Sequence, residues 1–382
     1  MRVAATVPWS LQWEHTGLSK RLMGQISAIA SSGVEIELFS HGEEADYGAF
    51  SNRRVRATVF EGEDPNLPLL NSLSFSLAFS EVAKGLECDL LHCFNTTALF
   101  LDEEEYLLQM LNPTSAFVKE MLQGEYPEEG MYANKMRSYE VMSSMERREG
   151  ARAELVIVSS ELAKRNLVRL YGIPESKIRV IPTGVSPSEV DQSYEKKEEG
   201  LKVVLYPNRV SVMKGFRYMA EAMLEIRKSF PSAVMIVLGR IDKFDYGVVS
   251  PHLKVLRDAG CVSIGGFVDR ARLREYYKMA DVVVVPSLCD DLSLSLLEAV
   301  AMSTPVVATE NTGFPEVDEV GVKVRPKDGG EIADAVISLL SDRRIYREKR
   351  EGAKAVIGRY LWPSIGKRYL EAYREVQPSS SR

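Results

Sequence analysis

The strongest constraint on the fold of this chain is the alternation of short, uninterrupted apolar runs with amphipathic segments. The run of four valines at residues 282–285 would place no polar side chain on either face of a strand. Strands that are apolar on both faces are typical of parallel sheets covered by helices on both sides, because only there are both faces buried. The alternation therefore predicts an α/β fold with doubly wound parallel sheets.

The alternation occurs in two blocks, which fits the two or three domains expected of 382 residues. The first block contains the strand patterns "RVAATV", "VEIELFS", "CDLLHCF" and "ELVIVSS", and the second contains "LKVVLYP", "AVMIVLG" and "PVVAT". Between them, "PSEVDQSYEKKEEG" is charged and lacks an apolar stripe, as is typical of a linker. We predict a Rossmann-like domain over residues 1–190, a linker over 191–200 and a second domain over 201–361, followed by an amphipathic helix over 362–377.

The composition excludes several classes of function. A net charge of −6 gives no basic footprint for nucleic acid. No apolar run approaches the roughly 18 residues of a membrane-spanning helix, and the N-terminus lacks a secretory pattern. The four cysteines form no C-x-x-C pair, so we expect a cytoplasmic protein. The short basic stretches "SKRL" and "NRRVR" leave open a peripheral contact with a membrane surface.

Several catalytic motifs are absent from the sequence. It contains no D-x-D and no cluster of His, Asp and Glu at metal-ligand spacing, so we expect no metal and no cofactor. It also lacks G-x-S-x-G, G-x-x-x-x-G-K-[ST] and, after the first strand, G-x-G-x-x-G. These absences argue against a serine hydrolase of that type, a P-loop enzyme and a typical dehydrogenase.

Polar residues follow the strands of the second block. Ligands of such sheets bind at the carboxyl ends of the strands, and with two domains the cleft between them is the expected site. "VVLYPNRVSVMKG" places Arg209 and Lys214 after a strand and before a helix, where two cations and a glycine suit a phosphate. The alternative is that both are solvated surface cations.

Three carboxylates lie in or near "PSLCDDLSLSLLEAV", which follows the valine run. Asp290 and Asp291 fall on the loop after the strand, and Glu298 falls in the next helix. Ser295 to Glu298 fits the capping box S-x-x-E, so Glu298 would cap a helix that begins near Ser295. The alternative is that Glu298 accepts hydrogen bonds from ligand hydroxyls, because carboxylate oxygens are acceptors.

The N-terminal half offers weaker signals. Gly17 lies between the first strand and the first helix, where glycine lets the backbone approach a phosphate or a sugar. His92 ends another strand, and a lone histidine at such a position is more often structural.

In this order, the pieces resemble the family 4 retaining glycosyltransferases of the two-Rossmann-domain (GT-B) architecture, best over about residues 150–376. The family stretch "PSxxEGFGLxxLEAMAxGxPVVAT" lies over "PSLCDDLSLSLLEAVAMSTPVVAT" without a gap, with Asp290 on the first Glu of E-x7-E and Glu298 on the second. The family pattern "GRLxxxKG" lies over "NRVSVMKG", with Arg209 and Lys214 on its two cations.

The resemblance implies two Rossmann-like domains facing across a cleft, with the helix over 362–377 packed back on the first. It also implies a retaining, metal-independent transfer of a hexosyl-type sugar from a nucleotide-diphosphate sugar to a sugar, lipid or small-molecule acceptor. Arg209, Lys214 and Asp290 would be catalytic, the two cations neutralising the diphosphate. The donor-binding residues would be Gly17, Gly215, Gly239, Asp291, Leu292, Ser293, Leu294, Ser295 and Glu298, with Glu298 on the ribose. The acceptor-side residues would be His92, Asn95 and Lys119.

The chain departs from the family pattern at four positions of the acidic loop. Asp290 replaces Glu, Asp291 and Ser293 replace glycines, and Leu292 replaces Phe. The family's histidine after a central N-terminal strand is not apparent either, and "PTSAFVKEML" offers Lys119 or Glu120 there. These departures motivate a second hypothesis, a catalytically altered nucleotide-sugar binding protein of the GT-B fold. A third hypothesis is an epimerase or phosphorylase of the same fold.

Overall fold

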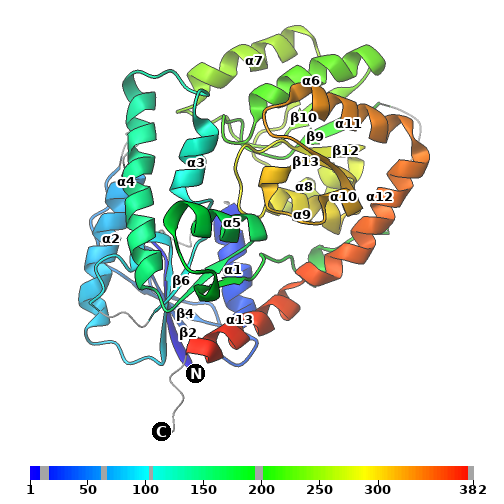
Figure 1. The fold of residues 1–382 in the computed structure, drawn as a ribbon. Helices are drawn as coiled ribbons and strands as arrows, with labels where there is room; N and C mark the ends of the chain where they lie inside the picture. The colour runs from blue at the N-terminus through cyan, green and yellow to red at the C-terminus, as the bar shows by residue number, and fades with distance from the viewer. Residues whose placement is uncertain (9–16, 62–66, 103–105, 194–200, 377–382) are drawn as a thin grey trace. The chain divides into compact units, whose positions relative to one another are not determined.

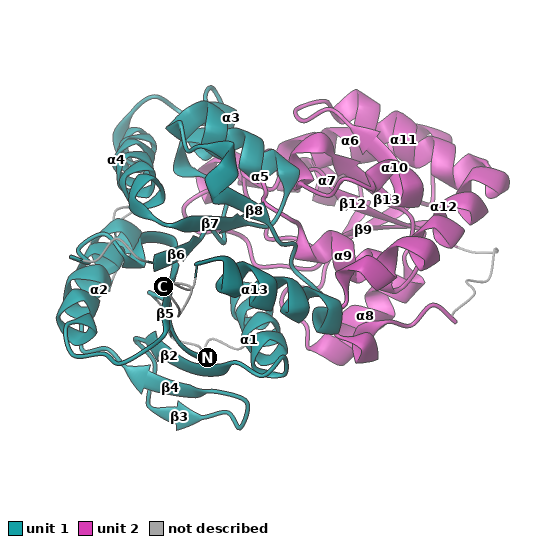
Figure 2. Ribbon diagram, turned by 60° about the horizontal axis from the view of Figure 1, so that its bottom comes forward, with its two compact units in different colours: residues 1–184, 362–382 teal, residues 185–361 magenta. Residues whose placement is uncertain are grey.

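In the computed structural model the chain forms two compact units, each a sheet flanked by helices (Figure 1). The first unit comprises residues 1–184 and 362–382, and the second comprises residues 185–361 (Figure 2). The structure describes residues 1–8, 17–61, 67–102, 106–193 and 201–376. The two parallel-sheet units confirm the predicted α/β class with two Rossmann-like domains.

The sheet of the first unit has the strand order β3-β4-β2-β1-β5-β6-β7-β8. All neighbouring strands are parallel except β3 and β4. The strands are β1 (Arg2–Thr6), β2 (Glu35–Ser40), β3 (Ala45–Asp46), β4 (Ser51–Arg54), β5 (Leu90–Phe94), β6 (Tyr106–Gln109), β7 (Leu155–Val158) and β8 (Ile178–Val180). The helices are α1 (Gly17–Ala30), α2 (Leu67–Ala83), α3 (Ser115–Leu122), α4 (Gly130–Arg152), α5 (Glu161–Asn166) and α13 (Trp362–Val376).

The sheet of the second unit has the order β11-β10-β9-β12-β13-β14, and all its strands are parallel. The strands are β9 (Val203–Tyr206), β10 (Val234–Val237), β11 (Val262–Ile264), β12 (Val282–Val285), β13 (Val306–Thr309) and β14 (Gly321–Val324). The helices are α6 (Phe216–Ser229), α7 (Tyr246–Asp258), α8 (Arg270–Met279), α9 (Leu294–Ala301), α10 (Val317–Val320), α11 (Gly329–Ser341) and α12 (Arg343–Val356). This unit also contains three short helical turns, η4 (Pro187–Glu189), η5 (Glu310–Thr312) and η6 (Ile357–Tyr360). The first unit contains the short helical turns η1 (Asn95–Thr97), η2 (Leu167–Tyr171) and η3 (Glu175–Lys177).

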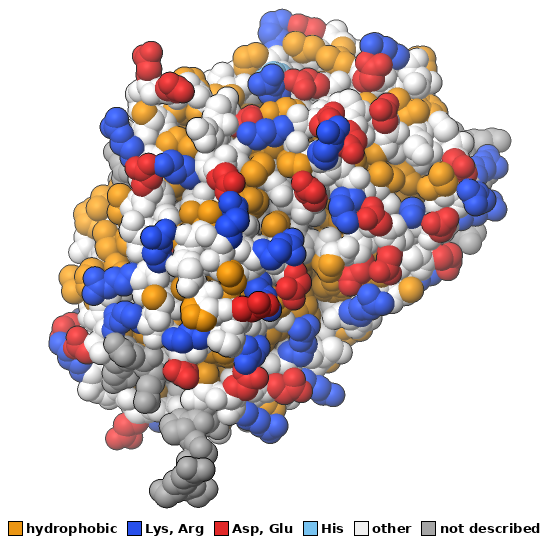
Figure 3. All heavy atoms as spheres, viewed as in Figure 1, with side chains coloured by type: hydrophobic (Ala, Val, Ile, Leu, Met, Phe, Trp, Pro, Cys, Tyr) orange, Lys and Arg blue, Asp and Glu red, His pale blue; other side chains and the backbone are white. Residues whose placement is uncertain are grey.

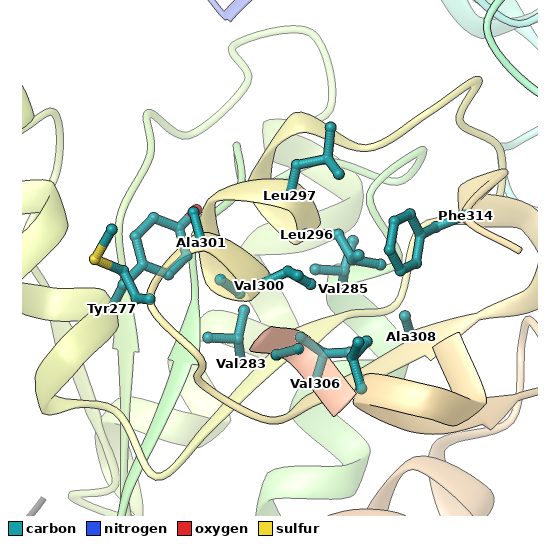
Figure 4. Packing of buried hydrophobic residues seen from close by; sticks show 14 of the residues in the cluster. Tyr277, Val283, Val285, Leu296, Leu297, Val300, Ala301, Val306, Ala308 and Phe314 are labelled. Carbon is teal, nitrogen blue, oxygen red and sulfur yellow. The ribbon is translucent and has the colours of Figure 1, made fainter. Parts of the chain in front are cut away.

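The valine run forms the central strand β12, and all four of its side chains are fully buried. On one side, Leu296 and Val300 of α9 pack over Val285 and the neighbouring strand β13 (Figure 4). Burial on both faces stabilises by about 1.5–3 kcal/mol for each large apolar side chain. The uninterrupted apolar pattern is therefore the direct cause of the strand's central position.

The last helix, α13, packs against α1 in the first unit through two close approaches. A Cβ atom on Gly24 of α1 would lie 2.4 Å from Nε1 of Trp362, and one on Gly366 of α13 would lie 2.4 Å from the carbonyl oxygen of Ala28. Glycine at both positions lets the helices come close, and the buried Trp362 lies in the core between them.

The boundary between the units falls after Gly184, earlier than the predicted residue 190. The reason is that residues after 184 bind elements of the second unit. The backbone N–H of Asp191 donates to the carbonyl of Ala301, and the carboxylate of Asp191 lies 2.7 Å from Nζ of Lys278. The hydrogen bond from Lys278 lowers the pKa of Asp191 to about 2. Of the predicted linker, residues 194–200 lie outside the described part of the chain.

The described helices include none that is both long enough and apolar enough to cross a membrane. Figure 3 shows basic and acidic side chains interspersed over the viewed face, with apolar side chains gathered over α2. In that helix Leu70 and Leu77 are exposed.

Ser303 closes the turn after α9 in an unfavourable conformation. Its φ is +55°, a left-handed value that favours glycine, and its side chain is only 1% exposed. Its buried hydroxyl has no hydrogen-bond partner among the described residues. A left-handed residue after a helix is ordinarily glycine, because glycine has no Cβ to clash.

We expect Ser303→Gly to stabilise the protein by about 1 kcal/mol, because it removes both the strained Cβ and a buried unpaired hydroxyl. Urea denaturation of the variant and the wild type measures the difference. Ser303→Ala, which removes only the hydroxyl, should give a smaller gain. A glycine variant less stable than the wild type would contradict the view that the Ser303 side chain is unfavourable in this turn.

Candidate functional site

The turn between β9 and α6 is held at both ends by one tyrosine. The Tyr206 hydroxyl lies 3.1 Å from the carbonyl oxygen of Arg209 and 3.0 Å from that of Lys214, and it donates to them. Burial raises the pKa of Tyr206 far above its usual value, so the hydroxyl keeps its proton. The Asp245 carboxylate accepts from the backbone N–H of Val212 at 2.8 Å within the turn. The backbone that carries both predicted cations is therefore fixed.

Gly215 ends this turn and precedes α6. Its φ is +67°, and a Cβ there would lie 1.9 Å from the carbonyl oxygen of Pro286. The backbone of the β9 turn thus touches the loop after β12, which only glycine permits. Similarly, a Cβ on Gly239, after β10, would lie 2.4 Å from the carbonyl oxygen of Asn208. The turns after three neighbouring strands therefore converge.

The convergence brings two predicted catalytic residues together. Nζ of Lys214 lies 2.5 Å from Oδ2 of Asp290, with the side chains 21% and 15% exposed. Asp290 is held in place from both sides. Its Oδ1 accepts from the backbone N–H of Asp291, and its own N–H donates to the carbonyl of Asn311. The result is a half-buried ion pair at the carboxyl end of the sheet.

Arg209 lies on the same turn but has a different partner. Its Nη1 is 3.1 Å from Oδ2 of Asp242, in the segment after β10, and its side chain is 53% exposed. Sequence reasoning did not find Asp242, because no local pattern connects it to Arg209.

The predicted donor-binding residues of the acidic loop divide into two groups. Asp291, Leu292 and Ser293 are buried, whereas Leu294 and Ser295 in the first turn of α9 are half-buried. The Ser293 N–H donates to the carbonyl of Thr312 at 3.2 Å, which ties the loop to the segment after β13.

The capping interpretation of Glu298 is wrong. Helix α9 begins at Leu294 with Ser293 as its N-cap, so Ser295 lies inside the first turn instead of capping it. Oε2 of Glu298 accepts from the Tyr277 hydroxyl of α8 at 3.0 Å. Burial, reinforced by the charge of Glu298, raises the pKa of Tyr277 well above its usual value. The sequence signal for Tyr277 was its place four residues after Leu273, on the inner face of an amphipathic helix.

The predicted residues of the first unit are not brought together by any described contact. Gly17 is the first residue of α1, and residues 9–16 before it lie outside the described part of the chain. Asn95 has a φ of +49°, and its Oδ1 accepts from the backbone N–H of Leu111 at 2.9 Å. Lys119 of α3 pairs with Glu140 of α4 on the surface.

His92 belongs to a buried polar network. Its Nδ1 accepts from the Tyr373 hydroxyl of α13 at 2.7 Å, and its Nε2 donates to Oε1 of Gln109 at 3.0 Å. Gln109 in turn donates to the Tyr369 hydroxyl and to Oε1 of Gln25. Burial lowers the pKa of His92 to about 3. The geometry fits the structural alternative stated above, because both ring nitrogens are occupied.

In the described part of the chain, no three His, Cys, Asp or Glu side chains are placed to hold a metal ion. At the carboxyl end of the second unit's sheet, Lys214, Asp290, Arg209 and Asp242 supply charge to a ligand. This arrangement suits a ligand that carries both an anionic group and hydroxyl groups. The cations at this sheet edge can bind the anionic group, and the carboxylates can accept hydrogen bonds from the hydroxyls.

Two family models match the chain, one in each half. The model of Glycosyltransferase Family 4 matches residues 16–189, and that of Glycosyl transferases group 1 matches residues 201–342. The chain therefore carries a Glycosyltransferase Family 4 domain followed by a Glycosyl transferases group 1 domain. An uncharacterized glycosyltransferase of Methanocaldococcus jannaschii is 30% identical over 269 residues. These cover 64% of this chain and 65% of that protein, so the match spans less than two thirds of the relative's length.

Solved structures show the same fold at low identity. Sucrose-phosphate synthase from Thermosynechococcus elongatus superposes with a TM-score of 0.79 at 19% identity, covering 98% of this chain and 99% of that one. Anabaena HepE in complex with UDP-glucose gives 0.69 at 17% identity, covering 98% and 100%. The fold is therefore that of the GT-B glycosyltransferases.

We expect Gly215→Ala to destabilise the protein by about 3 kcal/mol, because a Cβ would meet both a left-handed φ and the Pro286 carbonyl. Chemical denaturation measures the effect. Gly358→Ala is the matched control, because that glycine is not left-handed and a Cβ there meets no atom within 4 Å. Equal effects in the two variants would show that the converging turns are not tightly packed.

We also expect His92 to make stability depend on pH. The folded pKa of about 3 lies below the ordinary 6.5, so below pH 6.5 the unfolded chain binds a proton that the folded chain does not. The wild type should therefore lose about 1.4 kcal/mol per pH unit relative to His92→Asn as the pH falls from 6 to about 4. Urea denaturation of both proteins across that range measures this slope. Parallel pH profiles would contradict a neutral, buried His92.

Proposed function

We propose that this chain is a retaining glycosyltransferase that moves a hexosyl-type sugar from a nucleotide-diphosphate sugar to an acceptor. The observation that carries the proposal is the half-buried pair of Lys214 and Asp290 at the carboxyl end of the second unit's sheet. The two family domains and the HepE complex with UDP-glucose support a nucleotide sugar as the donor.

Lys214 would act on the leaving diphosphate. When the bond between the sugar and the diphosphate breaks, negative charge develops on the phosphate oxygens, and a fixed cation stabilises it. Lys214 stands directly before the N-terminus of the 14-residue helix α6, whose first N–H groups also favour an anion. Arg209, on the same turn, supplies a second cation. We propose that these two side chains replace the charge that a metal ion would supply.

The carboxylates would position the donor. Glu298 keeps its carboxylate in place through Tyr277, and we propose that it accepts hydrogen bonds from the ribose hydroxyls. Asp290 would lie beside the transferred sugar once the diphosphate draws Lys214 away from it. The proposed donor-binding set keeps Gly17, Gly215, Gly239, Asp291, Leu292, Ser293, Leu294 and Ser295.

The acceptor would bind in the first unit, where Asn95 and Lys119 remain the proposed contacts. We propose a cytoplasmic protein with a sugar, lipid or small-molecule acceptor. A membrane-surface acceptor is supported by the exposed Leu70 and Leu77 of α2. The basic stretch "NRRVR" supports it less, because Arg53 and Arg54 pair with Glu37 and Glu43.

The same ion pair supports a second candidate, a nucleotide-sugar binding protein with altered catalysis. Asp290 neutralises Lys214 at 2.5 Å, and a cation held in this way is less available to a diphosphate. This candidate predicts nucleotide binding without sugar transfer or donor hydrolysis.

We expect Lys214→Ala to lower the rate of nucleotide release from the donor by about 100-fold or more, because it removes a group that stabilises the leaving diphosphate. A panel of nucleotide sugars, screened first by thermal shift and then for nucleotide release, measures this. A donor at 100 times its dissociation constant stabilises the wild type by about 2.7 kcal/mol.

Lys228→Ala is the control, because that lysine lies near the C-terminal end of α6, the helix that Lys214 precedes, and is exposed beside Glu225. Wild-type release by Lys214→Ala would remove Lys214 from the mechanism. A wild type that binds a donor but never releases nucleotide would favour the second candidate. A wild type that neither binds nor turns over any donor would refute both.

A further inference from the structure

The turn after β9 carries a buried amide that is only partly satisfied. Asn208 is 7% exposed, and its Nδ2 has no hydrogen-bond partner among the described residues. Its Oδ1 lies 3.3 Å from the Ser295 hydroxyl, which donates to it and to the carbonyl of Pro207. A buried donor without a partner is costly to the folded state, so such an atom in a functional region indicates a partner that the chain itself does not supply.

The amide is linked to the carboxylate that the proposed function assigns to the ribose. Ser295 and Glu298 stand three residues apart on α9 and so lie on one face of the helix. The Tyr277 hydroxyl donates to Glu298, and the Ser295 hydroxyl lies close enough to Tyr277 to influence its pKa. Asn208, Ser295, Tyr277 and Glu298 therefore form one polar cluster, the ribose cluster, to which the turn after β9, helix α8 and the N-terminal half of α9 contribute.

The two ends of the ribose cluster are complementary to a hydroxyl group. A carboxylate only accepts hydrogen bonds, so a hydroxyl bound to Glu298 uses its proton there and is left with free lone pairs. An amide N–H is the donor that such a lone pair needs. A ribose diol offers two neighbouring hydroxyls of this kind, and burying one against Glu298 alone would leave its oxygen unsatisfied.

We propose that Asn208 is a specificity-determining residue for the donor nucleotide, whose Nδ2 donates to the ribose hydroxyl that donates to Glu298. The inference rests on the proposed function, since it requires that the ribose bind at Glu298. At position 208 the pattern "GRLxxxKG" has a glycine, which has no side chain. The proposed contact therefore comes from a side chain that the pattern lacks. It selects ribonucleotides over deoxyribonucleotides, because only a ribose presents the full diol.

The test combines substitutions of Asn208 with removal of single ligand hydroxyls. Calorimetry first finds which of UDP, ADP and GDP binds the wild type most tightly, and then uses its 2′-deoxy and 3′-deoxy forms. Asn208→Ala should raise the dissociation constant of the ribonucleotide by about fivefold to tenfold, as expected for one hydrogen bond. For the deoxynucleotide that lacks the contacted hydroxyl, the same substitution should change the dissociation constant by less than about twofold.

Two further variants serve as a repeat and as a control. Asn208→Gly removes the side chain without a buried remnant and should repeat the result. Ser303→Gly removes another buried, unpartnered polar group of the same unit and should leave all three dissociation constants unchanged.

Equal losses for the ribonucleotide and both deoxynucleotides would show that Asn208 only shapes the turn, and this would overturn the proposal. Unchanged binding by the Asn208 variants, with a wild type that binds nucleotide, would also overturn it and leave the proposed function standing. A wild type that binds none of the three nucleotides would refute both. Nucleotide release from the donor sugar, measured separately, tests transfer and does not bear on Asn208.

Discussion

Burial of β12 on both faces is the constraint on which the second unit depends. A strand whose four side chains are all buried can carry polar groups only beyond its ends. The loop after β12 therefore collects the acidic residues. The parallel strands β9 and β10 end at the same edge, where the turn after β9 carries Arg209 and Lys214 and the segment after β10 carries Asp242. The proposed chemistry is thus a consequence of how the core excludes polar side chains.

Close backbone contact then sets the spacing of the charges. Gly215 and Gly239 let the turns after β9, β10 and β12 approach one another, and Tyr206 fixes the carbonyls of the first turn. Rigid backbone keeps Lys214 at hydrogen-bonding distance from Asp290 without a covalent link. An anion that enters this edge meets groups already in position, which reduces the reorganisation needed during a reaction.

Much of this could be predicted from the sequence, for stated physical reasons. The valine run predicted β12 at residues 282–285, because a continuous apolar run leaves few alternatives. The ordered motifs predicted that Lys214 and Asp290 belong to one site. The capping prediction from the S-x-x-E pattern was wrong, because α9 begins directly after Ser293. The N–H of Ser293 bonds to the carbonyl of Thr312, a tertiary contact that a four-residue pattern cannot contain. The hydrogen-bond partner of His92, Tyr373 of α13, lies 281 residues away in the sequence, so no local pattern indicates it.

The return of α13 to the first unit has a consequence for how the chain is made. The chain leaves the first unit after Gly184 and rejoins it at Trp362, and Val185 and Leu361 form a parallel bridge where the two crossings meet. During synthesis the whole second unit emerges before the helix that covers α1 exists. The pocket for Trp362 between Gly24 and Gly184 therefore stays open to water while residues 185–361 fold. The first unit therefore completes its core last, although it is the first to leave the ribosome.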